Sequence, residues 1–555
     1  MKKNIRFSNL DRSEIIQNLV KNKFDLIIIG GGITGGGIAM DAASRGLKVA
    51  LVEKGDFASG TSSKSTKLIH GGLRYLKQFD FWLVKEVGSE RAIVHKLAPH
   101  LVLPEKMLLP LIEGGSYGKW LTSIGLKVYD ILAQVSGDDK RKMLEKKEAL
   151  ELEPLLPKKK LKGAGYYAEY RTDDARLTIE NIKTALTYGA VPVNYAEVTG
   201  FMYTSGIISG VHIADGLSGQ EFTVKSTYVI NAAGPWVDDL RGMNNSKNGK
   251  RLHLTKGVHL VFPHKKLPVK QSVYFDVPDG RMIFAIPRGK ITYVGTTDTN
   301  YDQDKDNVKL DLADALYLIS AVNNMFPKIH LKMEDIISSW AGLRPLIHEE
   351  GKKASELSRK DEIFVSDTGL ISIAGGKLTG YRKMAERVIN LLSKKMKDDK
   401  GIELPECQTE QIPLCGNEFK KSKHVKKYIS EIFERIKAEG FKEYDAWYLV
   451  TTYGKQTETI LEYYSKQKDK DSYIRMAKAE LHYGFNYELI ATPMDFFIRR
   501  TGRLYFDIES VSYLLDPILD EFQTVFKTEE LQILSWREKI LKEIDEHSIF
   551  SLDRA

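Results

Sequence analysis

The sequence predicts an α/β fold in the larger, N-terminal part of the chain and a mostly helical domain after it. The first observation is a strand, turn, helix and strand pattern in residues 24–54, where apolar runs flank a segment of small residues. The second is a series of apolar, β-rich runs that continues to about residue 390. The third is a change after about Leu392, where long segments carry apolar residues at helical spacing. A chain of 555 residues is also too long for one core, so we expect several domains.

The boundary between the two parts is predicted near residues 395–405, which divides the chain into residues 1–395 and 396–555. Ser393–Lys400 is rich in lysine and is predicted to be a linker. The segments predicted as strands in the first part include 258–262, 282–286 and 291–295, and those predicted as helices in the second are 425–437, 457–467, 472–482 and 531–546.

Composition excludes some classes of protein. No run approaches the roughly 20 apolar residues of a membrane span, and the N-terminus lacks the apolar run of a signal peptide, so we expect a cytoplasmic protein. The net charge of +8 is modest beside 82 basic and 74 acidic residues, and it suits an anionic substrate, a membrane surface or nucleic acid equally. Cys407 and Cys415 lack histidines at zinc-finger spacing, so we expect no metal site.

A glycine motif follows the first predicted strand. Gly30, Gly32 and Gly35 fit the pattern G-x-G-x-x-G, in which the glycines permit a tight turn, close approach to a pyrophosphate and close packing of helix on strand. Glu53 ends the next strand, where an acid binds ribose hydroxyls. These features predict a Rossmann-type dinucleotide site, with phosphates at the helix N-terminus. The run Gly35-Gly36-Gly37 departs from the usual turn, and we expect it to loosen the start of the helix.

Two later segments favour FAD over NAD. Residues 228–236 form a strand that runs into a small-residue turn containing Gly234. Residues 369–379 form another strand that ends in glycines, including Gly376, and a helix is predicted directly after it at 381–392. In FAD enzymes such a late helix points its N-terminus at the isoalloxazine, where its dipole stabilises negative charge on the reduced ring.

Several motifs together resemble the FAD-dependent glycerol-3-phosphate dehydrogenases. They are Thr61–Leu76, Lys256–His259, Gly295–Thr299, Ala341–Leu346, Gly375–Arg382 and, in the helical part, Met494–Thr501. The resemblance covers nearly the whole chain. It implies a glutathione-reductase-like FAD-binding Rossmann domain interleaved with a mixed-sheet domain that caps the substrate, followed by a helical C-terminal domain.

The resemblance also implies a reaction. The family oxidises sn-glycerol 3-phosphate to dihydroxyacetone phosphate in glycerol catabolism and passes the electrons to a membrane quinone. We therefore expect peripheral association with the inner face of the cell membrane and no nucleic-acid partner. The sequence leaves the oligomeric state open, a homodimer included.

The reaction requires a base for the hydroxyl proton and cations for the phosphate. His259 is the leading candidate for the base, because histidine takes up a proton near neutral pH, although a strand histidine is more often structural. By resemblance, Arg344 binds the alcohol oxygen or stabilises the forming alkoxide. The residues expected to bind the substrate are Arg74, Tyr75, Lys377 and Arg359.

The remaining expectations concern the cofactor and the membrane. Thr61, Ser62 and Ser63 offer hydroxyl and N–H groups to FAD, Lys377 contacts either flavin or phosphate, and His70 lies near the flavin without an assigned step. Lys119–Leu132 is an amphipathic segment that would suit a membrane surface or, equally, its own domain.

Three alternatives remain open. An oxidase would pass the electrons to oxygen and form hydrogen peroxide, but we see no extra internal insertion of the kind such oxidases often carry. A flavin-binding sensor without turnover is disfavoured by the retained Arg74, His259, Arg344 and Lys377. An amine substrate is disfavoured because several cations suit a phosphate better than a lone carboxylate.

Overall fold

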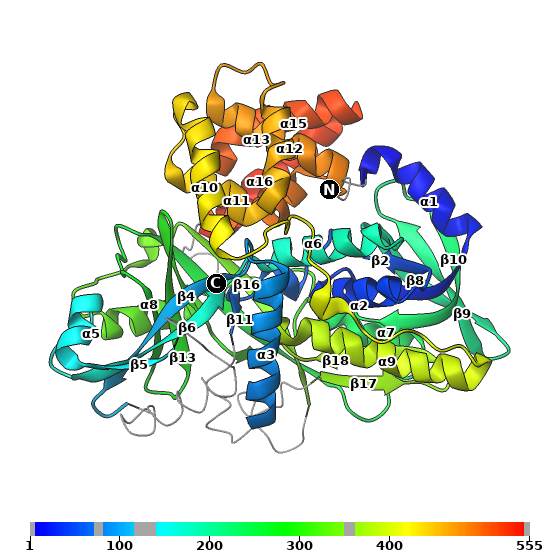
Figure 1. Cartoon of the computed structure of the whole chain (residues 1–555), viewed down its shortest axis with the longest axis horizontal. Helices are drawn as coiled ribbons and strands as arrows, with labels where there is room; N and C mark the ends of the chain where they lie inside the picture. The colour runs from blue at the N-terminus through cyan, green and yellow to red at the C-terminus, as the bar shows by residue number, and fades with distance from the viewer. Residues whose placement is uncertain (1–5, 71–80, 116–139, 349–360, 549–555) are drawn as a thin grey trace.

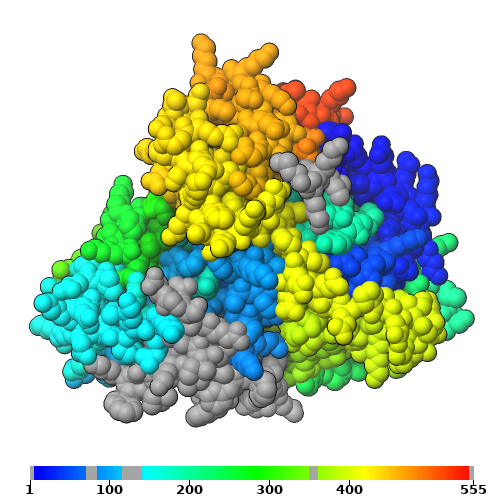
Figure 2. Space-filling model, in the orientation of Figure 1, coloured from blue at the N-terminus to red at the C-terminus, as the bar shows by residue number. Residues whose placement is uncertain are grey.

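The computed structural model describes residues 6–70, 81–115, 140–348 and 361–548. Two β-sheets with their helices lie side by side, and a group of helices from the C-terminal part lies above both (Figure 1). The space-filling view shows the same arrangement, with the helical part in yellow to red on top (Figure 2).

The first sheet has a parallel centre, in the order β18-β10-β1-β2-β7. Its parallel strands are β1 (Lys23–Ile29), β2 (Val49–Val52), β7 (Val191–Val193), β10 (Glu221–Asn231) and β18 (Leu370–Gly375). Antiparallel strands extend it: β8 (Ala196–Thr204), β9 (Ile207–Asp215) and β17 (Asp361–Val365). Ile28 lies between Leu51 and Ile230 in register, and all three are buried. This fits the near-continuous apolar runs that a parallel sheet covered on both faces requires.

Helices and a hairpin cover this sheet on its two faces. The helices on one face are α2 (Ile33–Ser44), α6 (Asp174–Thr187) and α9 (Tyr381–Lys400). The other face packs against α1 (Arg12–Lys21), α7 (Val237–Met243) and the β8–β9 hairpin.

The second sheet is mostly antiparallel and has the order β15-β11-β14-β13-β12-β4-β6-β3, with β16 beside β11 and β5 beside β6. Its strands are β3 (Leu68–Ile69), β4 (Leu103–Ile112), β5 (Lys142–Glu145), β6 (Leu161–Arg171), β11 (Leu252–Pro263), β12 (Ser272–Asp276), β13 (Met282–Arg288), β14 (Ile291–Gly295), β15 (Thr299–Asn300) and β16 (Ser338–Ile347). The helices α5 (Lys146–Leu152) and α8 (Leu312–Met325) cover one face. Helix α3 (Phe81–Leu97) lies between the two sheet regions (Figure 1).

Four C-terminal helices bury the other face of the second sheet: α13 (Ser472–Tyr487), α14 (Arg503–Phe506), α15 (Ile508–Phe526) and α16 (Glu530–Ser548). The remaining ones, α10 (Lys423–Ile436), α11 (Glu443–Tyr453) and α12 (Thr457–Tyr464), pack with α13 in a core of their own. A π-helical turn, η12, spans Asp495–Arg500.

The four predicted C-terminal helices are confirmed, and α11, α14 and α15 are additional to them. The prediction of a linker at Ser393–Lys400 is wrong, because α9 continues to Lys400 and ends at Gly401, which has a positive φ of 70°. Lysine is a good helix former, so a lysine-rich surface helix resembles a linker in composition. The expectation that Gly35–Gly37 loosens α2 is also corrected, since a Cβ on Gly37 would lie 2.9 Å from the Tyr381 ring. Gly36 and Gly37 let α6 and α9 approach α2.

Candidate functional site

The carboxyl ends of the parallel strands open onto a cavity of about 370 Å³. Parallel strands run the same way, so the turns after β1, β2, β10 and β18 meet at one edge. The predicted cofactor residues that line the cavity are Gly30, Gly32, Glu53, Thr61, Ser62, Gly234, Gly376 and Lys377. Gly35 and Ser63 are outside this lining, and both are buried.

The glycine turn has the geometry that the motif requires. Gly30 has a φ of 112°, and a Cβ there would lie 2.6 Å from the carbonyl oxygen of Ala232. A Cβ on Gly35 would lie 1.8 Å from the carbonyl oxygen of Gly30, so only glycine permits this approach of helix to strand. Gly32, Ile33 and Thr34, at the start of α2, line the cavity. The helix N-terminus therefore lies where an anionic diphosphate would be stabilised.

Glu53 ties the glycine turn to the loop that follows β2. Its Oε2 accepts a hydrogen bond from the amide of Gly31 at 2.6 Å, and its Oε1 accepts one from the amide of Gly55 at 2.9 Å. Burial raises the pKa of Glu53, against the lowering effect of these two N–H groups. The side chain lies at the strand end and on the cavity, as the ribose-binding role requires.

The segment Thr61–Lys67 leads from the cavity to the second sheet. Thr61 Oγ1 donates to the carbonyl of Leu343 at 2.7 Å, and the indole of Trp340 donates to the carbonyl of Ser65 at 3.0 Å. Two motifs of the family resemblance thus meet here, although they are far apart in the sequence.

Lys67 fixes the far end of this segment. Its buried ammonium donates to Asp174 Oδ1 at 2.5 Å and to the carbonyl of Ser63 at 2.7 Å. The backbone of Lys67 has a φ of 61°, which is uncommon outside glycine. The ion pair connects the segment to the start of α6.

His259 lies on β11, buried beneath this segment. Its Nε2 is 3.0 Å from Thr66 Oγ1, and its ring stacks on Trp340 with centroids 4.8 Å apart. Its Nδ1 is buried and has no hydrogen-bond partner among the residues that the structure describes. Burial, and then the charges of Arg344 and Lys67, hold the pKa of His259 well below its ordinary value. The imidazole is therefore neutral near pH 7.

Arg344 lies on β16, next to β11. Its guanidinium donates to the carbonyl of Thr297 at 3.0 Å and to Thr296 Oγ1 at 2.8 Å, and it pairs with Asp298 at 3.3 Å. A Cβ on Gly257 would lie 2.2 Å from the guanidinium, so this glycine makes room for it. Arg344 thus holds the Gly295–Thr299 motif as well as lying near His259.

The structure separates the predicted residues into groups. His259 and Arg344 lie on neighbouring strands outside the cavity lining. The lining includes Pro345, which follows Arg344 in the sequence, and Ser65, which precedes the Thr66 that contacts His259. Lys377 lies on the cavity at the turn before α9. Arg74, Tyr75, Arg359 and the amphipathic segment Lys119–Leu132 lie outside the described residues.

His70 follows β3, just beyond the Thr61–Lys67 segment. Its carbonyl accepts a hydrogen bond from Thr379 Oγ1 at 3.3 Å, and its ring lies edge-on to Phe284 with centroids 6.1 Å apart. His70 therefore links the turn after β18 to the second sheet, and its expected proximity to the flavin stays a prediction.

Sequence reasoning missed Trp340 and the Lys67–Asp174 pair. Trp340, Gly342 and Arg344 alternate along β16, so they share one face of the strand. That this face meets His259 follows from the register, in which Trp340 is opposite His259. No signal within either strand alone gives this register.

The residues at the cavity fit FAD. A dinucleotide suits three features of the cavity: the glycine turn, where a Cβ would clash with neighbouring backbone, the N-terminus of α2, and the carboxylate at the end of β2. Over the described residues, no group of three or more histidines, cysteines or acids has the arrangement of a metal site. Within the same residues, none of the helices has the length and apolarity needed to span a membrane.

Comparisons with known proteins agree with this geometry. Residues 25–382 match the family model of the FAD dependent oxidoreductases, and residues 407–532 match that of the C-terminal domain of alpha-glycerophosphate oxidase. The chain is 51% identical over 530 residues to the aerobic glycerol-3-phosphate dehydrogenase of Bacillus subtilis, covering 95% of this chain and 96% of the relative. It is 48% identical over 542 residues to the same enzyme of Staphylococcus aureus strain MRSA252, covering 97% of each.

Solved structures give the same result. The glycerol-3-phosphate dehydrogenase from Bacillus halodurans, determined in complex with FAD, superposes with a TM-score of 0.84 at 41% identity and covers 98% of both chains. The L-α-glycerophosphate oxidase of Mycoplasma pneumoniae has a TM-score of 0.55 at 20% identity, covers 70% of this chain and 97% of its own, and shows the fold alone. The predicted fold class, FAD cofactor and family resemblance are confirmed. The chain belongs to the FAD-dependent oxidoreductases, and within them to the family of aerobic glycerol-3-phosphate dehydrogenases.

Proposed function

We propose that the protein oxidises sn-glycerol 3-phosphate to dihydroxyacetone phosphate and delivers the electrons to a membrane quinone. The observation that carries this proposal is the 51% identity to an aerobic glycerol-3-phosphate dehydrogenase over 95% of the chain. The strands that bear His259 and Arg344 also lie within residues 25–382, the part that matches the FAD dependent oxidoreductases.

The residues around the cavity would hold FAD, which supplies the ring that accepts a hydride when bound. The backbone at Gly30 and Gly32 and the start of α2 would bind the diphosphate, and Glu53 the ribose. Gly376 and Lys377, at the turn before α9, would lie near the reactive ring. The positive end of α9 would favour negative charge there.

His259 would remove the proton from the substrate hydroxyl. Its lowered pKa keeps the imidazole neutral, so a lone pair is available without prior loss of a proton. Its stacking on Trp340 and its contact with Thr66 fix the ring's orientation. Arg344, close enough to lower the pKa of His259, would stabilise the negative charge that forms on the alcohol oxygen.

The substrate phosphate requires cations at the other end of the pocket. Arg74, Arg359 and Lys377 are the proposed partners, with Tyr75 donating a hydrogen bond. Arginine suits this role because its planar fork matches two phosphate oxygens.

The electron acceptor separates this proposal from its nearest competitor. The match of residues 407–532 to the alpha-glycerophosphate oxidase C-terminal domain favours an oxidase as the second candidate. The test supplies the holoenzyme with sn-glycerol 3-phosphate and either oxygen or a water-soluble quinone. We expect one dihydroxyacetone phosphate per quinone reduced and little hydrogen peroxide. Stoichiometric peroxide with no response to quinone would support the oxidase and contradict the quinone proposal.

Delivery to a quinone implies contact with the bilayer, so we propose peripheral association with the inner face of the cell membrane. Lys119–Leu132 is the proposed contact, since it combines lysines with apolar residues at helical spacing. We expect the protein to float with anionic vesicles and Trp120→Glu to bind them less. Equal binding by both proteins would contradict a role for this segment.

A further inference from the structure

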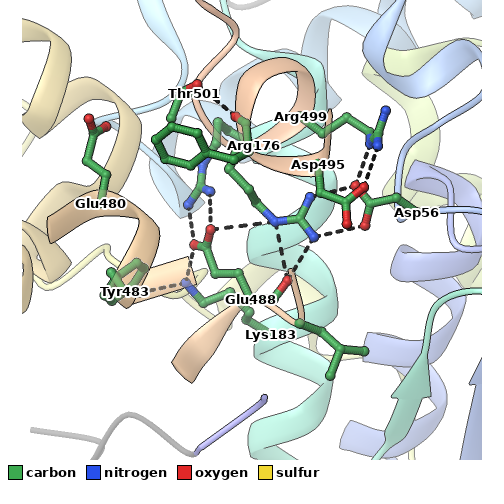
Figure 3. Close-up of polar contacts among 12 residues, drawn as sticks. Asp56, Arg176, Lys183, Glu480, Tyr483, Glu488, Asp495, Arg499 and Thr501 are labelled. Carbon is green, nitrogen blue, oxygen red and sulfur yellow. Dashed lines mark hydrogen bonds and ion pairs between the residues drawn. The ribbon is translucent and has the colours of Figure 1, made fainter. Parts of the chain in front are cut away.

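Asp56 is a buried carboxylate in the loop that joins β2 to the Thr61–Lys67 segment. It accepts two hydrogen bonds from Arg500, from Nη1 at 2.8 Å and from Nη2 at 2.9 Å. It also accepts a hydrogen bond from Arg499 Nε and one from Asn194 Nδ2 at 3.0 Å. Both arginines belong to the C-terminal helical part, so this one side chain joins it to the FAD-binding part. Figure 3 shows Asp56 facing Arg499 and Asp495.

The other side of this loop between β2 and Thr61, here called the cavity loop, forms a wall of the cofactor cavity. Lys54, Ser59 and Gly60 line the cavity on either side of Asp56 in the sequence. The amide of Ala58 donates to the carbonyl of Gly31 at 3.1 Å, which connects the loop to the glycine turn. A movement of Asp56 would therefore move groups that form the cavity.

Arg499 and Arg500 are themselves fixed by further hydrogen bonds within the helical part. They end the π-helical turn Asp495–Arg500, an element that occurs frequently at functional sites. Asp495 accepts a hydrogen bond from Arg499 Nη2 at 2.7 Å and another from the hydroxyl of Tyr195 at 2.6 Å. Arg500 Nη2 also donates to the carbonyl of Glu488 at 2.8 Å.

The network continues into α6 of the FAD-binding part. The carboxylate of Glu488 accepts hydrogen bonds from both Nη atoms of Arg176, each at 2.7 Å, and one from Lys183 at 3.1 Å (Figure 3). The cations of the network are Arg176, Lys183, Arg499 and Arg500, of which only Arg499 is partly exposed, and its buried carboxylates are Asp56, Glu180, Glu488 and Asp495. Each of these carboxylates thus pairs with at least one cation, as the burial of ionisable groups requires.

We propose that Asp56 is a positioning residue through which the helical domain holds the cavity loop in its FAD-binding conformation, so that docking of this domain and binding of FAD strengthen each other. The inference rests on the proposed placement of FAD in this cavity. It also gives a role to the Met494–Thr501 motif, which lies outside the cavity and contributes no group to the proposed chemistry. Coupling of this kind is reciprocal, so each event favours the other by the same factor.

The test compares this contact with an equally buried ion pair that does not touch the cavity loop. Arg503 Nη2 donates to Glu480 at 2.7 Å entirely within the helical part. The variants Asp56→Asn and Arg499→Gln are therefore matched by Glu480→Gln and Arg503→Gln, which each remove the same charge. The FAD dissociation constant is measured from the flavin fluorescence released on dilution of each holoenzyme. Unfolding is followed separately by circular dichroism.

We expect Asp56→Asn to raise the FAD dissociation constant roughly 5- to 150-fold at a temperature where the protein remains folded. Arg499→Gln should raise it by a smaller factor, because Arg500 still pairs with Asp56. The matched variants should lower the unfolding temperature but leave the FAD dissociation constant within about twofold of wild type. Excess FAD should restore the turnover of Asp56→Asn.

Unchanged FAD affinity in Asp56→Asn would overturn the inference. An equal loss of FAD affinity in Glu480→Gln would overturn it as well. If Asp56→Asn does not fold, Arg499→Gln measured against Arg503→Gln decides in the same way. The FAD dissociation measurement uses no substrate, so a protein that binds FAD but fails to oxidise glycerol 3-phosphate still tests this inference. A wild-type protein that binds no FAD would overturn both proposals.

Discussion

At the scale of single residues, the proposed chemistry depends on the environment of His259. The strand places the ring against Trp340, beneath the segment that contains Thr66, and beside two cations, Arg344 and Lys67. Burial and positive charge both disfavour the imidazolium. A histidine that would be half protonated near pH 6.5 in water is therefore neutral here.

This environment predicts how the rate of flavin reduction depends on pH. A base whose pKa is lowered loses its function only when the pH falls through the lowered value. At saturating sn-glycerol 3-phosphate, the reduction rate should stay nearly constant from pH 8 to about pH 6.5. A rate that falls to about half at pH 6.5 would contradict the neutral, buried base.

The variant His259→Ala tests the same role directly. Loss of a general base should lower the reduction rate by about 10²- to 10⁴-fold with FAD content unchanged. His264→Ala is the matched control, because His264 follows the same strand and its Nδ1 contacts Thr292 Oγ1 at 2.9 Å. It should retain the rate within about twofold. An equal loss of reduction rate in His259→Ala and His264→Ala would indicate that His259 has a structural role.

At the scale of elements, the βαβ unit of residues 24–54 was the part of the fold most readily predicted from the sequence. Its glycines, its terminal acid and its two strands lie close together in the sequence, so local rules suffice. The linker at Ser393–Lys400 was predicted wrongly because composition cannot distinguish an exposed helix from a loop. α15 was not predicted, and it carries Pro517 inside the helix, a residue that ordinarily ends one.

The same unit gives a sharp test of close packing. Gly35→Ala should abolish FAD binding or lower it by more than tenfold, because the added Cβ would lie 1.8 Å from the carbonyl oxygen of Gly30. Gly242→Ala is the matched control, since an added Cβ there meets nothing within 4 Å on helix α7. The FAD content of both variants is measured as flavin absorbance per mole of purified protein. A fully loaded Gly35→Ala protein would show that the turn is not the cofactor site.

At the scale of the whole molecule, the site joins distant parts of the chain. Strand alternation predicts which residues share a face, but the pairing of Trp340 with His259 depends on a register between segments about 80 residues apart. The ion network around Asp56 joins three regions, and no residue in any of them signals its partners. Sequence could therefore supply candidate residues, and only the fold could bring them together.

The ion network also predicts a pH dependence of stability. Although burial alone would raise it, Arg500 and Arg499 hold the pKa of Asp56 at about 2. The folded-state value lies below that of the unfolded chain, about 3.9, so the stabilisation is complete above that pH and is lost as pH falls towards 2. The unfolding-temperature gap between wild type and Asp56→Asn should thus be constant from pH 7 to 5 and shrink by about half near pH 3. A gap that stays unchanged at pH 3 would contradict this assignment.

The most direct test of the proposed function is anaerobic addition of sn-glycerol 3-phosphate to the purified holoenzyme while the flavin spectrum is recorded. We predict rapid loss of the oxidised flavin absorbance with this substrate and no change with glycerol, which lacks the phosphate. A spectrum that stays oxidised with sn-glycerol 3-phosphate would contradict the proposed function.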